Sequence, residues 1–386
     1  MSTPTVYIEK CDSYTSNVEE SLLHIIRPFG WPEKAAGKRV VIKVNLIHGS
    51  PPEKAAVTHP ILVKALCDLL VEAGAASVVI GDSPGGIYTV PYLNHVYKLA
   101  QMTQCESEHV RLNQDVGTRE TNYEKAFILH NFAYTSYLDD AELLIDFCKL
   151  KTHGMMGMSA AIKNMFGTIP GTTKPEYHMR FPNSTDFSKM LLDIYNYWHP
   201  DLCIVDAIEG MEGNGPTQGT PKHVGCLIAG ENGLDVDLVC AGIIHLKPAD
   251  IPLLEVAEQL GLFEKGRQDT LQTGGEDWHD FIQRDYRNVA VKSDIEFGGK
   301  GGLFGRGVRS VVRIFLKSRP QVHKKECIGC QKCFQVCPAR AITMKDKKPV
   351  IDRSVCIKCF CCQEFCPVGA MKVRRTPLAR MLSKNK

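Results

Sequence analysis

The chain has 386 residues, of which 44% are hydrophobic and 23% are charged, and its formal net charge is +3. This length predicts two to three domains, and this composition is typical of a globular protein with a substantial core. The sequence has no run of 18 apolar residues, so we expect no membrane span. Its first residues do not resemble a signal peptide, so we do not expect export. We therefore expect a cytoplasmic protein.

In chain order, the first predicted unit is an α/β domain with a mostly parallel sheet over residues 1–297. Its strongest helix has apolar residues at 61, 62, 65, 66, 69 and 70, and it ends before Gly74, a residue that readily adopts the left-handed conformation. Strands and helices alternate along the domain. The predicted strands are 6–8, 40–44, 77–80, 143–147, 202–205 and 224–229, and the predicted helices are 16–26, 61–72, 159–166, 187–197 and 236–245.

Ligands of parallel sheets bind beyond the carboxyl ends of the strands, which draws attention to residues 81–86, 148–154 and 206–215. The glycine-rich turn at 81–86 does not match G-x-G-x-x-G, and the chain has no Walker A motif. We therefore do not predict a dinucleotide or ATP site. An anion site and a simple turn are equally consistent with the first of these segments.

Of these three segments, residues 148–154 have the side chains that are best suited to binding or catalysis. If the strand continues through residue 151, Lys149 and Lys151 lie on one face, and Lys163 and Asn164 follow on the next helix. These ammonium groups would bind a carboxylate or a phosphate, and His153 would act as an acid, a base or a metal ligand. The alternative is a solvated basic rim.

At the third strand end, Asp206 and Glu209 are predicted to lie on a loop among glycines. Carboxylate oxygens in such a loop would hold Mg²⁺ or receive substrate hydroxyls. A long turn with hydrated acidic groups is an equally good interpretation.

The C-terminal region carries two copies of the pattern C-x2-C-x2-C-x3-C-P. This is the spacing of bacterial ferredoxins with two 4Fe–4S clusters, in which the fourth cysteine of each copy ligates the other cluster. Zinc knuckles and disulfide frameworks do not show three cysteines at this interval followed by Cys-Pro. Cys361 lies outside the pattern and is not expected to be a ligand. The predicted ligands are Cys327, Cys330, Cys333 and Cys366 for cluster 1, and Cys356, Cys359, Cys362 and Cys337 for cluster 2.

The other cysteines are scattered, which fits a reducing interior, and the clusters suggest an anaerobic host. Residues 323–386 contain 15 Lys and Arg against 4 Asp and Glu, so the rest of the chain is net acidic. The basic residues are dispersed and lack a recognition motif, so we do not expect nucleic-acid binding. A basic electron-transfer unit would instead dock on the acidic remainder of the chain or on an acidic redox partner.

These features divide the chain into four predicted segments. The α/β domain (1–297) is followed by a glycine-rich and basic linker (298–322), a double 4Fe–4S ferredoxin domain (323–371) and a basic tail (372–386).

The run LLIDFCKLKTHGMMGMSAAIKNMFGTIPG, with VDAIEGMEGNGPTQGTP downstream, resembles domain-of-unknown-function family 362. The resemblance covers roughly residues 38–245, and members of that family often carry a C-terminal double-cluster ferredoxin domain. It implies the α/β fold and the location of the site, but no particular reaction. The positions characteristic of the family fall on Lys149, Lys151, His153, Lys163, Asn164, Asp206 and Pro216.

Two hypotheses of function follow. In the first, the chain is an iron–sulfur oxidoreductase whose clusters pass electrons to an anionic substrate or cofactor held by the three lysines. His153 would then move a proton, and Asp206 or Glu209 would bind a divalent metal or orient the substrate. In the second, the chain is a ferredoxin-like carrier, or an activation or assembly factor for a partner enzyme, and the α/β domain binds that partner.

Overall fold

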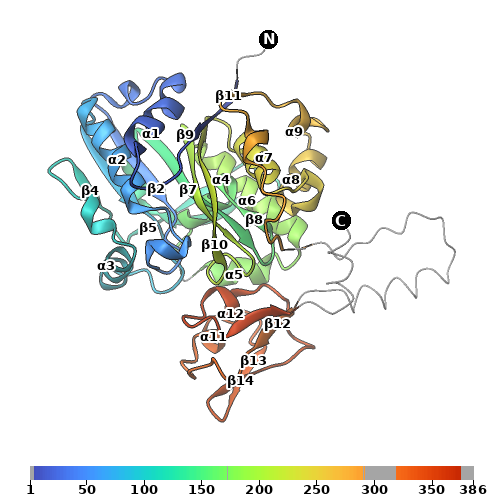
Figure 1. Ribbon diagram of the computed structural model, residues 1–386. Helices are drawn as coiled ribbons and strands as arrows, with labels where there is room; N and C mark the ends of the chain where they lie inside the picture. The colour runs from blue at the N-terminus through green and yellow to red at the C-terminus, as the bar shows by residue number, and fades with distance from the viewer. Residues whose placement is uncertain (1–3, 172, 290, 292–318, 375–386) are drawn as a thin grey trace.

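The computed structural model describes residues 4–171, 173–289, 291 and 319–374, in a large α/β unit with a small unit at one end (Figure 1). The predicted linker, apart from its last four residues, lies outside the described residues, as does the predicted tail beyond residue 374.

The centre of the large unit is a sheet that has nine strands within the described residues. Its order is β11-β1-β10-β9-β7-β2-β3-β4, with β8 paired to β7. Neighbours from β9 to β4 run parallel, whereas β10 is antiparallel to both β9 and β1. The predicted mostly parallel α/β fold is confirmed. The strands are β1 (Val6–Lys10), β2 (Arg39–Val44), β3 (Ser77–Gly81), β4 (Val110–Leu112), β7 (Leu143–His153), β8 (Gly157–Ser159), β9 (Leu202–Glu212), β10 (Thr220–Gly230) and β11 (Thr273–Gly275).

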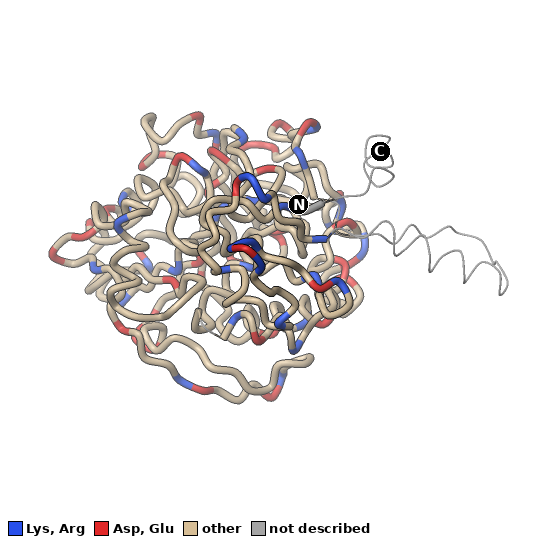
Figure 2. Tube along the Cα trace, turned by 90° about the horizontal axis from the view of Figure 1, so that it is seen from below, with Lys and Arg blue, Asp and Glu red and all other residues tan. Residues whose placement is uncertain are grey.

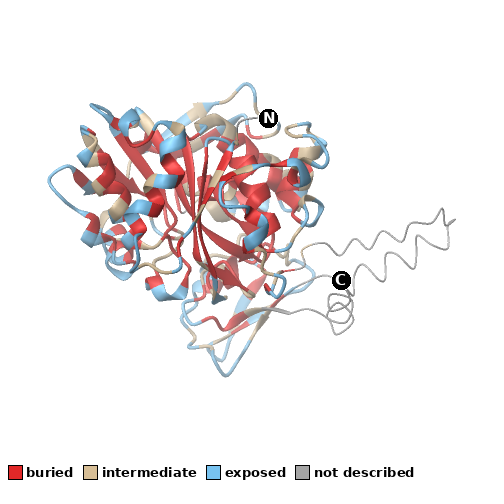
Figure 3. Ribbon diagram, turned by 45° about the horizontal axis from the view of Figure 1, so that its top comes forward, coloured by how far each residue is buried: buried red, intermediate tan, exposed pale blue. Residues whose placement is uncertain are grey.

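Helices cover both faces of the sheet, because alternate residues of each central strand are apolar and point to opposite sides. Ile42 and Ile145 belong to the core on the side of the first helices, and Val41 and Leu144 belong to the core on the other side. Figure 3 shows the central strands almost wholly buried. The helices are α1 (Val18–Ile26), α2 (Pro60–Glu72), α3 (Val90–Leu99), α4 (Ala161–Asn164), α5 (Lys174–Arg180), α6 (Ser184–Trp198), α7 (Gly233–Ile243), α8 (Pro252–Gln259) and α9 (Arg267–Thr270), and a separate hairpin joins β5 (Thr118–Asn122) to β6 (Asn131–Thr135).

Two of the central strands extend further than the core of each predicted strand. The strand that begins at Leu143 does continue through Lys151, as the grouping of the lysines required. The prediction of a loop from Asp206 is wrong, because β9 continues to Glu212. Residues 206–212 pair with β10, and this antiparallel ladder satisfies the backbone groups that a loop would have left to water.

The predicted helix over 159–166 is also shorter than expected. Its α-helical part is α4, and a 3-10 turn (Met165–Thr168) follows it. Gly167 lies inside this turn rather than ending the helix, and a glycine is needed there because the side chains of Lys43 and Asp82 leave no room for a Cβ atom.

In the described residues, the small unit consists of the β13–β14 hairpin, an antiparallel pair formed by its first and last strands, and two one-turn helices. Its second helix faces the large unit, whereas the β13–β14 hairpin lies at the far end (Figure 1). Its elements are β12 (Arg319–Val322), α11 (Lys332–Gln335), β13 (Ile342–Lys345), β14 (Lys348–Ile351), α12 (Cys361–Glu364) and β15 (Met371–Arg374).

Candidate functional site

The small unit encloses two cavities, and each is lined by four cysteine side chains. These are the two sets that the cysteine spacing predicts, including the exchange of the fourth cysteine between the copies. Nowhere in the described ranges do three His, Cys, Asp or Glu side chains form a group that could hold a single metal ion. Thiols that surround a cavity fit iron–sulfur clusters. The two sets are Cys327, Cys330, Cys333 and Cys366, and Cys337, Cys356, Cys359 and Cys362.

The small unit docks on the segment that follows β9. Gln363 Nε2 donates a 2.9 Å hydrogen bond to the carbonyl oxygen of Asn214, and Gln218 Nε2 donates one of 3.1 Å to that of Cys366. Phe365 packs so closely on Gly85 that a Cβ atom there would lie 2.6 Å from its ring. The small unit, which is also called the cluster unit below, is therefore held at the carboxyl ends of the parallel strands, where such sheets bind their ligands.

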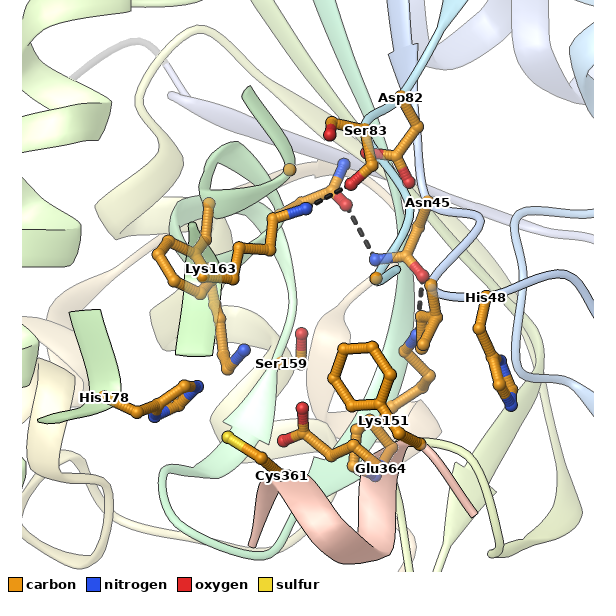
Figure 4. A pocket seen from close by; sticks show the side chains of 18 of the residues that line it. Asn45, His48, Asp82, Ser83, Lys151, Ser159, Lys163, His178, Cys361 and Glu364 are labelled. Carbon is orange, nitrogen blue, oxygen red and sulfur yellow. Dashed lines mark hydrogen bonds between the residues drawn. The ribbon is translucent and has the colours of Figure 1, made fainter. Parts of the chain in front are cut away.

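A pocket lies between the two units (Figure 4). Cys361 and Glu364 rise into it from α12, opposite Lys163 and Ser159 from the large unit. The wall that α12 forms is part of the second cysteine motif, because Cys361 lies between Cys359 and Cys362 in the sequence. The lining comprises the cations or imidazoles Lys43, Lys151, Lys163, Lys174, His48 and His178, the polar residues Asn45, Asp82, Ser83, Ser159, Asn164 and Glu364, and Cys361, with Ile47, Gly85, Phe166, Gly167, Pro175, Pro216 and Phe365.

The pocket has a surplus of positive charge. Lys43 Nζ lies 3.1 Å from Asp82 Oδ1, but within the described residues no carboxylate lies within 4.0 Å of the ammonium groups of the other three lysines. Lys151 Nζ donates instead to Asn45 Oδ1 and to the carbonyl oxygen of Ala56, both at 2.7 Å. Buried ammonium groups with only neutral partners favour a bound anion.

The protonation of these groups is tuned by burial. Burial lowers the pKa of Lys174 to about 7, and it also lowers the pKa values of Lys151 and Lys163. It lowers the pKa of His48 and of His178 to about 4, so both imidazoles are neutral at pH 7. The positive charge of the pocket therefore comes from its lysines, and a bound anion would favour their charged forms.

His153 joins the sheet to the cluster unit. Its Nδ1 accepts hydrogen bonds from the backbone N–H groups of Met155 and Met156, at 3.2 Å each. The proton of the neutral ring then resides on Nε2, which lies 2.8 Å from Glu364 Oε1. Burial and the charge of Lys163 lower the pKa of His153 to about 4. Burial opposes ionisation of Glu364, but His153 and Lys163 outweigh it and lower the pKa of that carboxyl.

Asn164 organises the floor of the pocket. Its Oδ1 accepts hydrogen bonds from Lys43 Nζ (2.8 Å) and Asn45 Nδ2 (2.7 Å), and its Nδ2 donates to Asp146 Oδ1 at 2.6 Å. Burial raises the pKa of Asp146 to about 8, which keeps this carboxyl largely protonated at pH 7. The network fixes Lys43 and Asn45 without adding a full negative charge near the lysines.

The predicted site residues fall into three places. Lys151, Lys163 and Asn164 line the pocket, and His153 contacts it through Glu364. Lys149 and Asp206 form a fully buried ion pair of 2.8 Å outside the pocket lining. That pair is completed by Tyr14, whose hydroxyl donates to Asp206 Oδ1 (2.9 Å) and accepts from Lys149 Nζ (2.7 Å).

Glu209 lies in the third place, at the surface, where its carboxylate pairs with the half-exposed imidazole of His223 at 2.9 Å. Neither Glu209 nor Asp206 belongs to a group of side chains in the described residues that could hold a metal ion. The structure therefore gives no support to a divalent metal at these carboxylates.

Several lining residues were missed. Asp82 lies in the segment 81–86 that the strand-end argument had singled out, although it was not named there, and Lys43 lies near the end of the predicted strand 40–44, where the same argument could have found it. Lys174 lies on a short helix without a sequence signal. Cys361 and Glu364 enter the pocket only because the cluster unit folds back, which no local pattern indicates.

Comparison with known proteins identifies both units. A family model described as domain of unknown function (DUF362) matches residues 40–242, and the chain belongs to this family. A model described as a 4Fe–4S dicluster domain matches residues 319–367. The predicted family and the predicted iron–sulfur domain are thus confirmed, and the small unit is an iron–sulfur domain of the electron-transfer type.

One relative is a thylakoid-associated protein of Synechocystis sp., which is 34% identical over 229 residues that make up 58% of this chain and 69% of the relative. Among solved structures, lactate racemase apoprotein from Thermoanaerobacterium thermosaccharolyticum matches with a TM-score of 0.40 and 12% identity over 62% of this chain. A Thermotoga maritima protein from a structural genomics programme matches with a TM-score of 0.36 and 11% identity over 58% of this chain. This chain covers 57% of the length of each of these two structures. Within the described residues, no helix is long and apolar enough to cross a membrane.

Proposed function

We propose that this member of the DUF362 family is an iron–sulfur oxidoreductase that reduces a small anionic substrate bound between its two units. The observation that carries this proposal is that α12 is both part of the second cysteine motif and a wall of the lysine-lined pocket. Bound at the two cysteine sets, 4Fe–4S clusters would supply single electrons, one cluster for each set.

Three lysines would bind the substrate. The ammonium groups of Lys151, Lys163 and Lys174 would hold its anionic group, because the described residues offer them no carboxylate within ion-pair distance. The rings of Phe166 and Phe365 would exclude water and strengthen these charge interactions. Lys43 is already paired with Asp82 and would act mainly by holding Asn164 in place.

A reduction also needs a proton. Lys174 is the best donor in the pocket, because burial brings its pKa to about 7, near neutral pH, where proton transfer is most effective. His153 was expected to move a proton, but its Nδ1 accepts two backbone hydrogen bonds and its Nε2 faces Glu364. We therefore assign His153 the role of positioning Glu364 and α12.

The second hypothesis, a carrier or an activation factor, is favoured by one observation. The first cysteine motif is open to solvent at Cys330, so electrons could leave the protein there for a partner enzyme. A carrier would not need the buried lysines of the pocket, and for that reason we prefer the enzyme.

The place of this reaction in the cell is also part of the proposal. The described cysteines include no disulfide, which fits a reducing cytoplasm and an anaerobic host. The name of the Synechocystis relative associates that protein with thylakoids, and a peripheral membrane association is the alternative for this chain.

Anion binding by the full-length, cluster-loaded protein tests the pocket. Sulfate, phosphate, a phosphate monoester, a monocarboxylate and a dicarboxylate would be titrated by calorimetry under exclusion of oxygen. We expect at least one class to bind, and we expect Lys163→Ala to abolish that binding. Lys265→Ala, at an exposed site away from the pocket, is the matched control and should bind as the wild type does. Equal binding by Lys163→Ala, or no binding by any anion, would contradict the proposed site.

A further inference from the structure

The two copies of the cysteine motif have unequal surroundings, although their spacing is the same. Cys330 in the first copy is exposed, whereas the corresponding Cys359 in the second is only 8% exposed. Phe334 is 47% exposed, whereas the corresponding Gln363 is fully buried and bonded to the large unit. Docking of the small unit therefore covers the second motif and leaves the first facing solvent.

The residue types of the two copies fit these different surroundings. Cys361, which is 1% exposed, lines the pocket, but Lys332 at the same place in the first copy is exposed. The second copy thus carries residues that are buried against the large unit, and the first copy carries a basic and an apolar residue that are exposed at the same places. An exposed pair of this kind is a candidate interaction surface.

An apolar patch lies over the first set of cysteines. It consists of Ile328 (65% exposed) and Val368 (41%), and Phe334 (47%) is a further exposed apolar side chain of the first motif. Ile328 and Val368 also line the cavity enclosed by the first cysteine set, and Cys330 of that set is itself exposed. A partner seated on this patch would come close to the cluster 1 thiols.

Exposed lysines lie close to the patch in the sequence, and one of them also contacts the first motif. Lys324, Lys325, Lys332 and Lys347 are all exposed, and Gly329 in the first motif packs against Lys347. Of the nearby acidic residues, Glu326 is already paired with Lys372 at 2.9 Å, and Asp346 lies at the tip of the β13–β14 hairpin. The segment 319–374 has 12 Lys and Arg against 4 Asp and Glu. Figure 2 shows where Lys, Arg, Asp and Glu lie along the chain, seen from the end of the molecule that carries the small unit.

We propose that this patch and its lysines form the docking face for a small acidic one-electron carrier protein of the ferredoxin or flavodoxin class. Each docking event would oxidise the carrier by one electron and reduce this chain by one, and two such events would supply a two-electron reduction in the pocket. The inward direction of flow rests on the proposed function, whereas the docking face itself does not. Charge complementarity selects an acidic partner, and the apolar centre provides the dry contact.

The test is the affinity of an acidic carrier for the full-length, cluster-loaded protein. A plant-type 2Fe–2S ferredoxin and an acidic flavodoxin would be the two probes, both oxidised so that no electrons move. We expect at least one to bind at low ionic strength and to bind progressively less tightly as salt is added. Failure of both probes to bind, or binding that salt does not change, would overturn the proposal.

Variants locate the face. Ile328→Glu and Lys332→Glu should each weaken carrier binding by about ten-fold or more, because one places charge in the apolar centre and the other reverses the rim charge. Val355→Glu, at a 47% exposed position beside the second motif, and Lys265→Glu on the large unit are the matched controls and should bind normally. Equal weakening by the controls would overturn the proposal.

The two proposals can fail separately. Lys163→Ala should leave carrier affinity unchanged, and Ile328→Glu should leave anion binding in the pocket unchanged. A protein that binds the carrier as described but no anion would refute the proposed function and retain the docking face. Anion binding without carrier binding would do the reverse. Circular dichroism and the visible spectrum of each variant would establish that its fold and clusters are intact.

Discussion

The Nε2 atom of His153 lies 2.8 Å from the Oε1 atom of Glu364, and this contact joins the last residue of a central strand to the last residue of the cluster helix. The strand end is where an α/β sheet binds its ligand, and the helix belongs to the cluster motif. This contact therefore helps to hold α12 against the end of the sheet on the other side of the pocket.

Replacing Glu364 by Ala should loosen the cluster unit from the sheet. His153 Nε2 would lose its partner in a buried site, which we expect to lower the free energy of unfolding by about 1–3 kcal/mol. Urea unfolding of the full-length protein measures this change, and hydrogen exchange should show faster opening of α12. Glu326→Ala removes an exposed pair with Lys372 and should leave stability almost unchanged. Equal losses in the two variants would contradict this account of the contact.

Anion affinity should fall as the pH rises through about 7. The pKa of Lys174 is lowered by burial to about 7, so its ammonium form predominates below that pH and is lost above it. Sulfate keeps its two charges throughout, and its affinity should decline by up to about ten-fold per pH unit above pH 7 if binding requires the protonated form. Calorimetric titrations with sulfate, repeated at intervals of about one pH unit between pH 5.5 and 9, measure this decline.

Lys174→Arg is the matched variant for this pH dependence. A guanidinium stays protonated throughout this range, so the fall that Lys174 causes should disappear from the profile. An unchanged fall in Lys174→Arg would assign the titration to another group in the pocket.

Iron content should separate the cluster ligands from Cys361. Cys337→Ser and Cys366→Ser each remove a thiol from one of the two cavities, so each should lose about half of the bound iron. Cys361→Ser should retain the full amount, because Cys361 lines the substrate pocket and neither cysteine cavity. Iron and sulfide analysis after anaerobic reconstitution decides the matter. Loss of iron from Cys361→Ser would contradict the assignment.

Asp206→Asn should affect stability rather than anion binding. It leaves Lys149 fully buried without its carboxylate, which we expect to cost about 3–5 kcal/mol of unfolding free energy. Anion affinity should be unchanged, because neither residue lines the pocket. Asp285→Asn, which removes the partner of Lys222 at an exposed site, should leave stability almost unchanged. Loss of anion binding without loss of stability in Asp206→Asn would return Asp206 to the site.

The sequence predicts the cysteine sets and most of the sheet because both depend on local spacing. The position of Cys366 in the second motif is enough to assign it to the first set. The periodicity of the apolar residues is enough to predict the helix that ends before Gly74. Grouping Lys149 with Lys151 in one pocket was less successful, because the pairing of β7 with β9 shifts register between them. Lys149 is then opposite Asp206, with which it forms a buried pair.

Contacts between distant segments account for the remaining differences. Glu364 reaches the strand end only because the cluster unit docks there, and no periodicity within the second cysteine motif encodes that contact. The extension of β9 past Asp206 depends in the same way on β10, whose pairing converts a glycine-rich segment into a ladder.

The central claim is that electrons from the cluster unit reach an anion in the lysine pocket. The most direct test is a single-turnover reaction in which the chemically reduced, full-length protein is mixed without oxygen with the anion that binds best. Reoxidation of the protein is followed by EPR and visible absorption, and the organic product by mass spectrometry. The account predicts rapid reoxidation with a reduced product in the wild type, and a loss of both in Lys163→Ala despite full reduction of its clusters. Equal reoxidation in Lys163→Ala, or none in the wild type with a bound anion, would contradict it.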